Sequence, residues 1–353
     1  MGTPELNKFI NSKRMLWLAV SLLMLVLQAC QPGDMVVITP TPFQSQSTIL
    51  PSSTSTVTQE VIPSQTVTPT RTEVTVTLSP SVTSTASSTA TSPSPVVFAA
   101  IGDYGTGDSS EADVAKLILS WNPEFIITLG DNNYPVGAAD HIDQAVGQFF
   151  HDYIFPYKGG YGSGAEVNRF FPSLGNHDLM TDNGQPYYDY FTLPGNERYY
   201  DFTWGTLHFF ALDDIESEPD GVGVSSKQAE WLKEGLAAST STWDIVYMHY
   251  PPYSSGLHGS TDWARWPYRE WGADVVLTGH DHTYERLEED GLPYFVNGLG
   301  GGGIYYFPNI LEGSQVRYNG DYGAMRIEAM DRYLKFEFII RSGELIDTFE
   351  LNK

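Results

Sequence analysis

Cysteine is nearly absent from this chain of 353 residues, in which Cys30 is the only one. A lone thiol excludes an internal disulfide framework and a metal site built from several thiolates. Basic residues are also scarce, because 19 Lys and Arg stand against 43 Asp and Glu, for a net charge of −24. Binding to a phosphate backbone demands a basic surface, so we expect no nucleic acid partner.

The apolar run near the start of the chain is also short. It extends from Met15 to Leu27, which is less than the roughly 20 apolar residues of a membrane-spanning helix. It follows Lys13 and Arg14 and ends in Leu27-Gln28-Ala29-Cys30, which resembles the lipobox of bacterial lipoproteins. We therefore expect residues 1–30 to be a signal peptide, with membrane attachment only through a lipidated Cys30 and the remainder facing the cell exterior. The alternative is an uncleaved membrane anchor in which the cysteine is incidental.

Residues 31–95 contain little that could form a hydrophobic core. From Met35 to Pro95 the chain is dominated by Ser, Thr, Pro and Val, and only Glu60, Arg71 and Glu73 are charged. Such a composition cannot offset the entropy of an ordered chain, so we expect a disordered tether. Residues 96–353 are long enough for one α/β domain. They carry the whole net charge, since acidic and basic residues balance before Val96.

Strand and helix signals alternate at the start of this domain. An apolar run at Val96 to Ile101 precedes a helical pattern at Ser109 to Trp121 and a second apolar run at Phe125 to Leu129. This order predicts a βαβ unit with parallel strands, which bind ligands at their carboxyl ends. Further strands are expected at Phe170 to Leu174, Leu207 to Leu212, Ile245 to Met248 and Val275 to Thr278, and helices near Ser225 to Ala238 and Thr261 to Trp271.

The last part of the chain alternates between apolar and polar residues, as antiparallel strands do. These segments are Tyr294 to Asn297, Ala324 to Met330, Leu334 to Ile340 and Glu344 to Leu351. Together with the βαβ unit they predict an α/β fold with two packed sheets flanked by helices.

Polar residues follow five of the buried runs. The five blocks are Gly102-Asp103-Tyr104-Gly105, Gly130-Asp131-Asn132-Asn133-Tyr134, Gly175-Asn176-His177-Asp178, Val246-Tyr247-Met248-His249 and Gly279-His280-Asp281-His282. A strand fixes its last residue, and a neighbouring glycine allows the sharp turn that brings a side chain to a shared point. Each block alone is ordinary turn chemistry. Their common position at strand ends predicts a metal site of oxygen and imidazole ligands suited to iron, zinc or manganese.

The five blocks resemble the calcineurin-like metallophosphoesterases, and Tyr134 in Gly-Asp-x-x-Tyr is similar to the purple acid phosphatase branch. The resemblance extends from Val96 to about Gly303 and implies a four-layer α/β/β/α sandwich. It implies that one metal ion is bound by Asp103, Tyr134 and His282, a second by Asn176, His249 and His280, and that both are bridged by Asp131.

The tyrosine ligand bears on the identity of the metals. A phenol ordinarily ionises at about pH 10, so a phenolate ligand calls for a strongly charged cation. We therefore expect Fe(III) at the site of Tyr134 and divalent Fe, Zn or Mn at the other. Two such ions activate water and hold the oxygens of a phosphoryl group, which predicts hydrolysis of a phosphate ester.

Two further histidines are expected beside the metals. His177 follows Asn176 directly, and His258 lies soon after His249. In the resembled family, histidines at these positions contact the substrate, which implies that both bind phosphate or protonate the leaving group. The alternative for His258 is an ordinary loop histidine. His141, His151 and His208 match no block and are expected to be structural.

The ligands alone leave several functions open. The expected function is hydrolysis of small phosphate monoesters, of the acid phosphatase type. A phosphodiesterase or nucleotidase would use the same ligands, because the residues that form the pocket rim decide between them. A third possibility is a non-catalytic surface protein with a structural metal. The coordination positions left for water count against it, since structural sites are usually closed by protein ligands.

Overall fold

The computed structural model describes residues 94–353, so the predicted signal peptide, Cys30 and nearly all of the predicted tether lie outside the described residues. No helix within the described range has the length and apolarity needed to cross a membrane.

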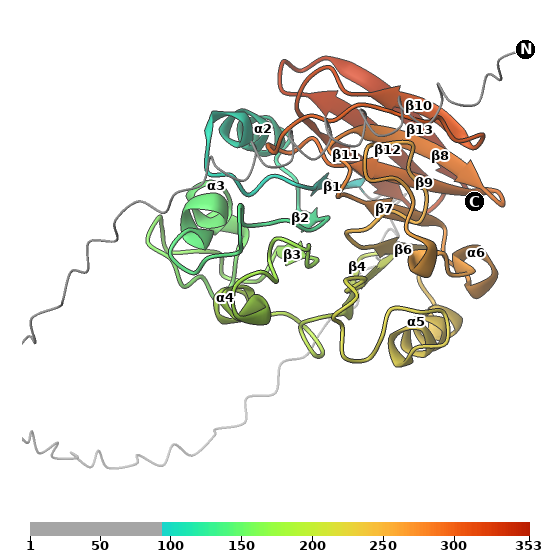
Figure 1. Ribbon diagram of the computed structural model, residues 1–353, viewed down its shortest axis with the longest axis horizontal. Helices are drawn as coiled ribbons and strands as arrows, with labels where there is room; N and C mark the ends of the chain where they lie inside the picture. Colours follow the sequence, from blue (N-terminus) through green and yellow to red (C-terminus); the bar gives the residue numbers. More distant parts are fainter. Residues whose placement is uncertain (1–93) are drawn as a thin grey trace, which may run out of the picture. The chain divides into compact units, whose positions relative to one another are not determined.

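The strands form two sheets (Figure 1). One has the order β13-β12-β11-β1-β2-β3, with bounds Leu345–Asn352, Tyr333–Ile340, Gly323–Met330, Val96–Ile101, Phe125–Thr128 and Phe170–Pro172. The other has the order β10-β8-β9-β7-β6-β5-β4, with bounds Ser314–Tyr318, Tyr284–Glu289, Leu292–Asn297, Val275–Thr278, Trp243–Tyr247, Leu207–Ala211 and Tyr200–Trp204.

The helices lie on the outer sides of these sheets. They are α2 (Ser109–Ser120), α3 (Gln148–Phe150), α4 (Gln185–Tyr190), α5 (Lys227–Ala238) and α6 (Tyr268–Trp271). Figure 1 shows α2 and α3 on one side of the strands and α5 and α6 on the other. Short helical turns occur at Asp143–Gly147, His151–Tyr153, Asp182–Gly184 and Asp262–Ala264.

The predicted βαβ unit is confirmed. β1 pairs in parallel with β2, and β2 with β3, while α2 connects the first two strands. The side chain of Asp108 caps α2 by accepting hydrogen bonds from the backbone N–H groups of Ser110 and Glu111. In the second sheet β5, β6, β7 and β9 are parallel, so their carboxyl ends point the same way.

Alternation along β5 shows how the layers pack. Leu207 and Phe209 belong to the core that also contains Phe98 of β1, whereas Phe210 packs in a separate cluster with Leu232 of α5. Successive side chains of a strand point to opposite faces, so one face of this sheet packs on the first sheet and the other on α5. The predicted four-layer α/β/β/α sandwich is therefore confirmed.

The structure corrects three details of the prediction. The expected helix from Thr261 to Trp271 is broken into a short turn and the single turn of α6, because Pro267 lacks a backbone N–H and restricts Trp266. Tyr294 to Asn297 lies in β9, which is antiparallel to β8 but parallel to β7. Strands β4, β8 and β10 were not predicted; β4 and β10 alternate buried or half-buried and exposed residues.

Candidate metal centre

The five polar blocks meet at the carboxyl ends of the parallel strands. Asp103 follows β1, Asp131 follows β2, and Asn176 follows β3 in the first sheet. His249 follows β6, while His280 and His282 follow β7 in the second. The backbone N–H of His280 donates to Asp103 Oδ2 at 2.8 Å, which joins the two sheets at this point.

Three of these residues have an unusual backbone conformation. The φ angles of Asp103, Asp131 and His280 are 55°, 53° and 67°, in the left-handed region that favours glycine. Strain of this kind persists where surrounding contacts enforce it, and it concentrates at functional sites. Here it turns each side chain sharply away from its strand.

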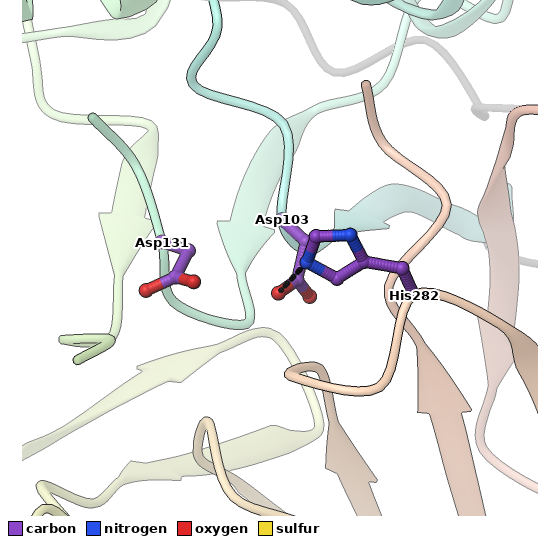
Figure 2. A group of neighbouring side chains, drawn as sticks. All are labelled: Asp103, Asp131 and His282. Carbon is purple, nitrogen blue, oxygen red and sulfur yellow. Dashed lines mark ion pairs between the residues drawn. The ribbon is translucent and has the colours of Figure 1, made fainter. Parts of the chain in front are cut away.

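Asp103, Tyr134 and His282 form one group of ligand atoms. The Tyr134 hydroxyl lies 3.3 Å from Asp103 Oδ1 and 3.0 Å from His282 Nε2, and His282 Nε2 lies 3.3 Å from Asp103 Oδ1. Figure 2 shows the His282 ring directed at the Asp103 carboxylate, with Asp131 beside them. Atoms of Asp103, Asp131 and His282 all lie within 4.8 Å of one another, a spacing suited to holding a metal ion.

Asn176, His249 and His280 form a second group. His249 Nε2 lies 3.0 Å from Asn176 Oδ1 and 3.2 Å from His280 Nδ1. Asp131 stands between the two groups, because its Oδ2 accepts from the Tyr134 hydroxyl at 2.9 Å and its Oδ1 lies 3.4 Å from His249 Nε2. One carboxylate therefore reaches both groups of ligands.

The histidine rings are oriented by backbone carbonyls. Nδ1 of His249 donates to the carbonyl of Leu129 at 2.8 Å, and Nδ1 of His282 donates to the carbonyl of Gly303 at 2.6 Å. Each bond leaves Nε2 free as an acceptor toward the ligand groups, as a metal-binding imidazole requires. The donor set and its orientation fit two metal ions.

Burial and neighbouring charges together set the pKa values of these residues. Burial alone would raise the pKa of Asp103, but His282, His249 and the His280 backbone N–H outweigh it and hold the pKa below its ordinary value. Burial likewise lowers the pKa of His249, while Asp131 and Asp103 raise it to about 9. Burial and the two aspartates raise the pKa of Tyr134, so the phenol needs a cation to ionise.

The two predicted outer histidines both border the ligand groups. The backbone N–H of His177 donates to Asp131 Oδ1 at 2.9 Å, and its Nε2 lies 3.9 Å from Asp131 Oδ2. His258 is exposed, and its ring stacks on that of His280 with 4.3 Å between centroids. His258 therefore lies at the site and not in an unrelated loop.

Other histidines have structural roles, as expected. His208 lies 2.9 Å from Asp201 and 3.2 Å from Ser239 Oγ, and His141 lies 2.9 Å from Asn133 Oδ1. His151 lies 2.9 Å from the carbonyl of Gly147.

Two aromatic residues at the site were not predicted. The ring of Tyr305 stacks on His282 at 4.2 Å, and the ring of Tyr250 meets His280 edge-on at 4.3 Å. Tyr250 directly follows the proposed ligand His249, and this position in the sequence could have predicted that it lies at the site. Tyr305 reaches the site through the turn at Gly298 to Gly303, where the N–H groups of Gly300 and Gly302 donate to the carbonyls of Gly102 and Asp103.

Comparison with known proteins identifies the family of this chain. Residues 96–284 match the family described as calcineurin-like phosphoesterase. Tartrate-resistant acid phosphatase type 5 of Mus musculus is 28% identical over 240 residues, covering 58% of this chain and 72% of the relative. Purple acid phosphatase 15 of Arabidopsis thaliana is 27% identical over 248 residues, covering 59% of this chain and 45% of the relative.

A solved structure shows the same fold. The purple acid phosphatase PPD1 from yellow lupin (Lupinus luteus) seeds has a TM-score of 0.60 at 19% identity, covering 73% of this chain and 54% of that chain. The family match extends over more than half of this chain and contains every predicted ligand from Asp103 to His282. The chain therefore belongs to the calcineurin-like phosphoesterases, where its purple acid phosphatase relatives identify it as a metal-dependent phosphoric ester hydrolase.

Proposed function

We propose that this protein hydrolyses small phosphate monoesters at the cell exterior, as an acid phosphatase with one Fe(III) and one divalent Fe, Zn or Mn ion. The observation that carries the proposal is the position of Asp131 between two ligand groups, one of which contains the Tyr134 hydroxyl. A tyrosine ligand in one group and only amide and imidazole ligands in the other suit two ions of different charge.

The residues divide into two ligand sets. Asp103, Tyr134 and His282 would hold the trivalent ion, Asn176, His249 and His280 would hold the divalent ion, and Asp131 would contact both. When bound, the ions supply Lewis-acid activation of the phosphoryl group and of the attacking water.

His177 and His258 would both serve the substrate, each from beside a different ligand group. The ring of His177 lies against Tyr134, 4.6 Å between centroids, while the ring of His258 lies against His280. Each ring borders one of the two ligand groups, so each is placed to donate a proton to a phosphoryl or leaving-group oxygen.

The charge around the site favours a monoester over a polyphosphate. Within residues 94–353, no Lys or Arg side chain forms an ion pair or a hydrogen bond with any of the nine proposed site residues. The site residues therefore hold no basic side chain in place for a second phosphate group, which supports a monoester substrate.

A substrate panel tests this function. Metal-loaded protein is assayed with para-nitrophenyl phosphate, a nucleoside triphosphate and bis-para-nitrophenyl phosphate at acid and neutral pH. We expect kcat/KM to be highest for the monoester. Faster turnover of the diester or the nucleotide would replace the proposal by the corresponding activity, and absence of all turnover would favour a non-catalytic surface protein.

The cellular location of the enzyme is proposed from the first 30 residues of the sequence. We infer that Cys30 is lipidated after cleavage of residues 1–29 and that it alone anchors the enzyme, which is supported by the lipobox-like Leu27-Gln28-Ala29-Cys30. Mass spectrometry of the mature membrane-bound protein should find a lipid on Cys30, and Cys30→Ser should release active protein. An unmodified Cys30 would contradict the anchor.

A further inference from the structure

Asp281 lies between two proposed ligands, His280 and His282, but its carboxylate serves a neighbouring loop. The side chain is fully buried. It accepts hydrogen bonds from Ser254 Oγ at 2.5 Å, from the backbone N–H of His258 at 2.8 Å and from that of Gly259 at 3.1 Å. A buried carboxylate with three donors is strongly held, because each donor satisfies part of its charge.

The loop Ser254 to Ser260 closes tightly around this carboxylate. A Cβ atom added to Gly256 would lie 2.4 Å from Cγ of Asp281, so only glycine fits there. A second buried acid, Glu285, accepts from the backbone N–H of Ser255 at 2.7 Å. The loop is therefore fixed from two positions on the segment that carries the metal ligands.

His258 depends on this loop for its position. Its ring stacks on His280 and meets Tyr305 edge-on at 5.3 Å, yet within residues 94–353 it forms no side-chain hydrogen bond. The backbone N–H bound to Asp281 is thus the directional contact that places His258 beside the ligand groups.

We propose that Asp281 is the positioning residue of His258, which it holds over His280 for proton donation to the substrate. This inference rests on the proposed function of His258. The segment from His280 to His282 then supplies two proposed metal ligands and also anchors His258 through Asp281. This shared anchor fixes the distance between His258 and the two ligands.

The chemistry of Asp281→Asn makes the proposal testable. Asp281 Oδ1 faces the N–H of His258, and Oδ2 faces the N–H of Gly259 and the hydroxyl of Ser254. An asparagine NH₂ group at either position would meet a backbone N–H, donor against donor. One anchor of the loop is lost in either orientation, while the volume of the side chain is kept.

Kinetics with para-nitrophenyl phosphate give the first readout. We expect Asp281→Asn to lower kcat by about tenfold to a hundredfold, part of the roughly 10² to 10⁴ of a general acid, with unchanged metal content. In a His258→Ala background the same change should have almost no further effect, because the two residues act as one unit. The control Asp262→Asn, an exposed carboxylate paired with Arg265, should leave kcat unchanged.

The position of His258 can be measured without turnover. In zinc-loaded protein, the ring contacts with His280 and Tyr305 should shift the NMR resonance of the His258 ring, and Asp281→Asn should abolish that shift. If Asp281→Asn fails to fold, Ser254→Ala should reduce this shift, because it removes the hydroxyl that donates to Asp281 and accepts from the backbone N–H of Gly256.

Two results would overturn the inference. One is an unchanged His258 resonance in both Asp281→Asn and Ser254→Ala. The other is a double mutant of Asp281→Asn and His258→Ala in which the two separate losses of kcat multiply. Inactive wild-type protein would refute the proposed function instead, while the NMR shift would still decide the position of His258.

Discussion

His177 is held differently from the histidines proposed to bind metal. Its Nδ1 donates to the carbonyl of Pro135 at 2.6 Å, and about a third of its side chain is exposed, at 30%. His249, by comparison, is fully buried. A partly exposed ring that is fixed at Nδ1 is suited to exchange a proton with a substrate through Nε2.

Replacement of His177 by alanine should separate catalysis from metal binding. We expect His177→Ala to keep both metal ions and any colour, while kcat falls by something like the roughly 10² to 10⁴-fold of a lost general acid. His208→Ala is the control, because the polar partners of His208, which are Asp201, Ser239 and Asp244, are not among the proposed site residues. Loss of metal from His177→Ala would show that the histidine is a ligand.

The residues of the candidate site could be predicted because their chemistry is local to short blocks. Asp131 and His282 stand next to glycines or in a repeated His-x-His pattern, and these signals survive without any knowledge of the fold. Tyr305 carries no such signal, and Asp281 lies within the His-x-His block without being distinguished by it. Their roles depend on contacts with His282 and with the loop of His258, which only the folded chain brings together.

Among the elements, the loop after β1 packs closely against the loop after β2. The N–H of Gly105 donates to the carbonyl of Asp131, and the N–H of Tyr134 donates to the carbonyl of Gly105 at 2.7 Å. These contacts fix the two loops that supply Asp103, Asp131 and Tyr134.

Gly105→Ala should disrupt this contact. An added Cβ would lie 2.0 Å from the carbonyl oxygen of Asn132, a backbone atom with little room to move. We expect the free energy of unfolding to fall by about 1–3 kcal/mol and metal affinity to fall with it. Gly223→Ala is the matched control, since nothing lies within 4 Å of its added Cβ. Equal melting temperatures of the two variants would contradict the close packing.

The first turn of α2 contains a buried acid, Glu111, that makes the stability of the fold depend on pH. Burial raises the pKa of Glu111 well above its ordinary value of 4.5, although Gly107 donates to it. Glu111 therefore ionises at a lower pH in the unfolded chain than in the folded chain. The free energy of unfolding consequently falls as pH rises above 4.5.

Glu111→Gln should remove this pH dependence. We expect the melting temperature of the variant, relative to wild type, to increase as pH rises from about 4 to about 7. Asp113→Asn changes an exposed carboxylate of the same helix and should not produce the trend. A pH-independent difference between Glu111→Gln and wild type would show that the carboxyl ionises normally.

Strands and helices were predicted where apolar runs are continuous, as in β1, β2 and β7. The misplaced elements have physical causes. Pro267 interrupts a helical pattern, and Gly272, with φ of 117°, then ends α6 after one turn. β8 was missed because it begins directly after the turn that carries His282, where the sequence looks like a continuation of the polar block.

On the scale of the whole molecule, the two sheets supply different proposed ligands. The first sheet provides Asp103, Asp131, Tyr134 and Asn176, and the second provides His249, His280 and His282. The metal site therefore depends on the packing of one sheet on the other. Pairing of strands far apart in sequence, such as β1 with β11, could not be predicted from local patterns.

Residues 1–95 should be dispensable for folding and catalysis. The two sheets, both hydrophobic clusters and all predicted ligands lie between Val96 and Asn352. We expect protein lacking residues 1–95 to be soluble, with the melting temperature and kcat of the full chain. Insoluble or inactive truncated protein beside active full-length protein would move the domain boundary.

The visible absorption spectrum of the iron-loaded protein tests the central claim most directly. If Tyr134 binds Fe(III), the wild type should show a charge-transfer band from phenolate to iron. Tyr134→Phe should lose this band, because the substitution removes the phenolate. The matched control Tyr305→Phe, which changes a tyrosine stacked on His282, should keep the band. A colourless iron-loaded wild type, or a band that survives in Tyr134→Phe, would contradict the assignment of Tyr134 as a ligand of trivalent iron.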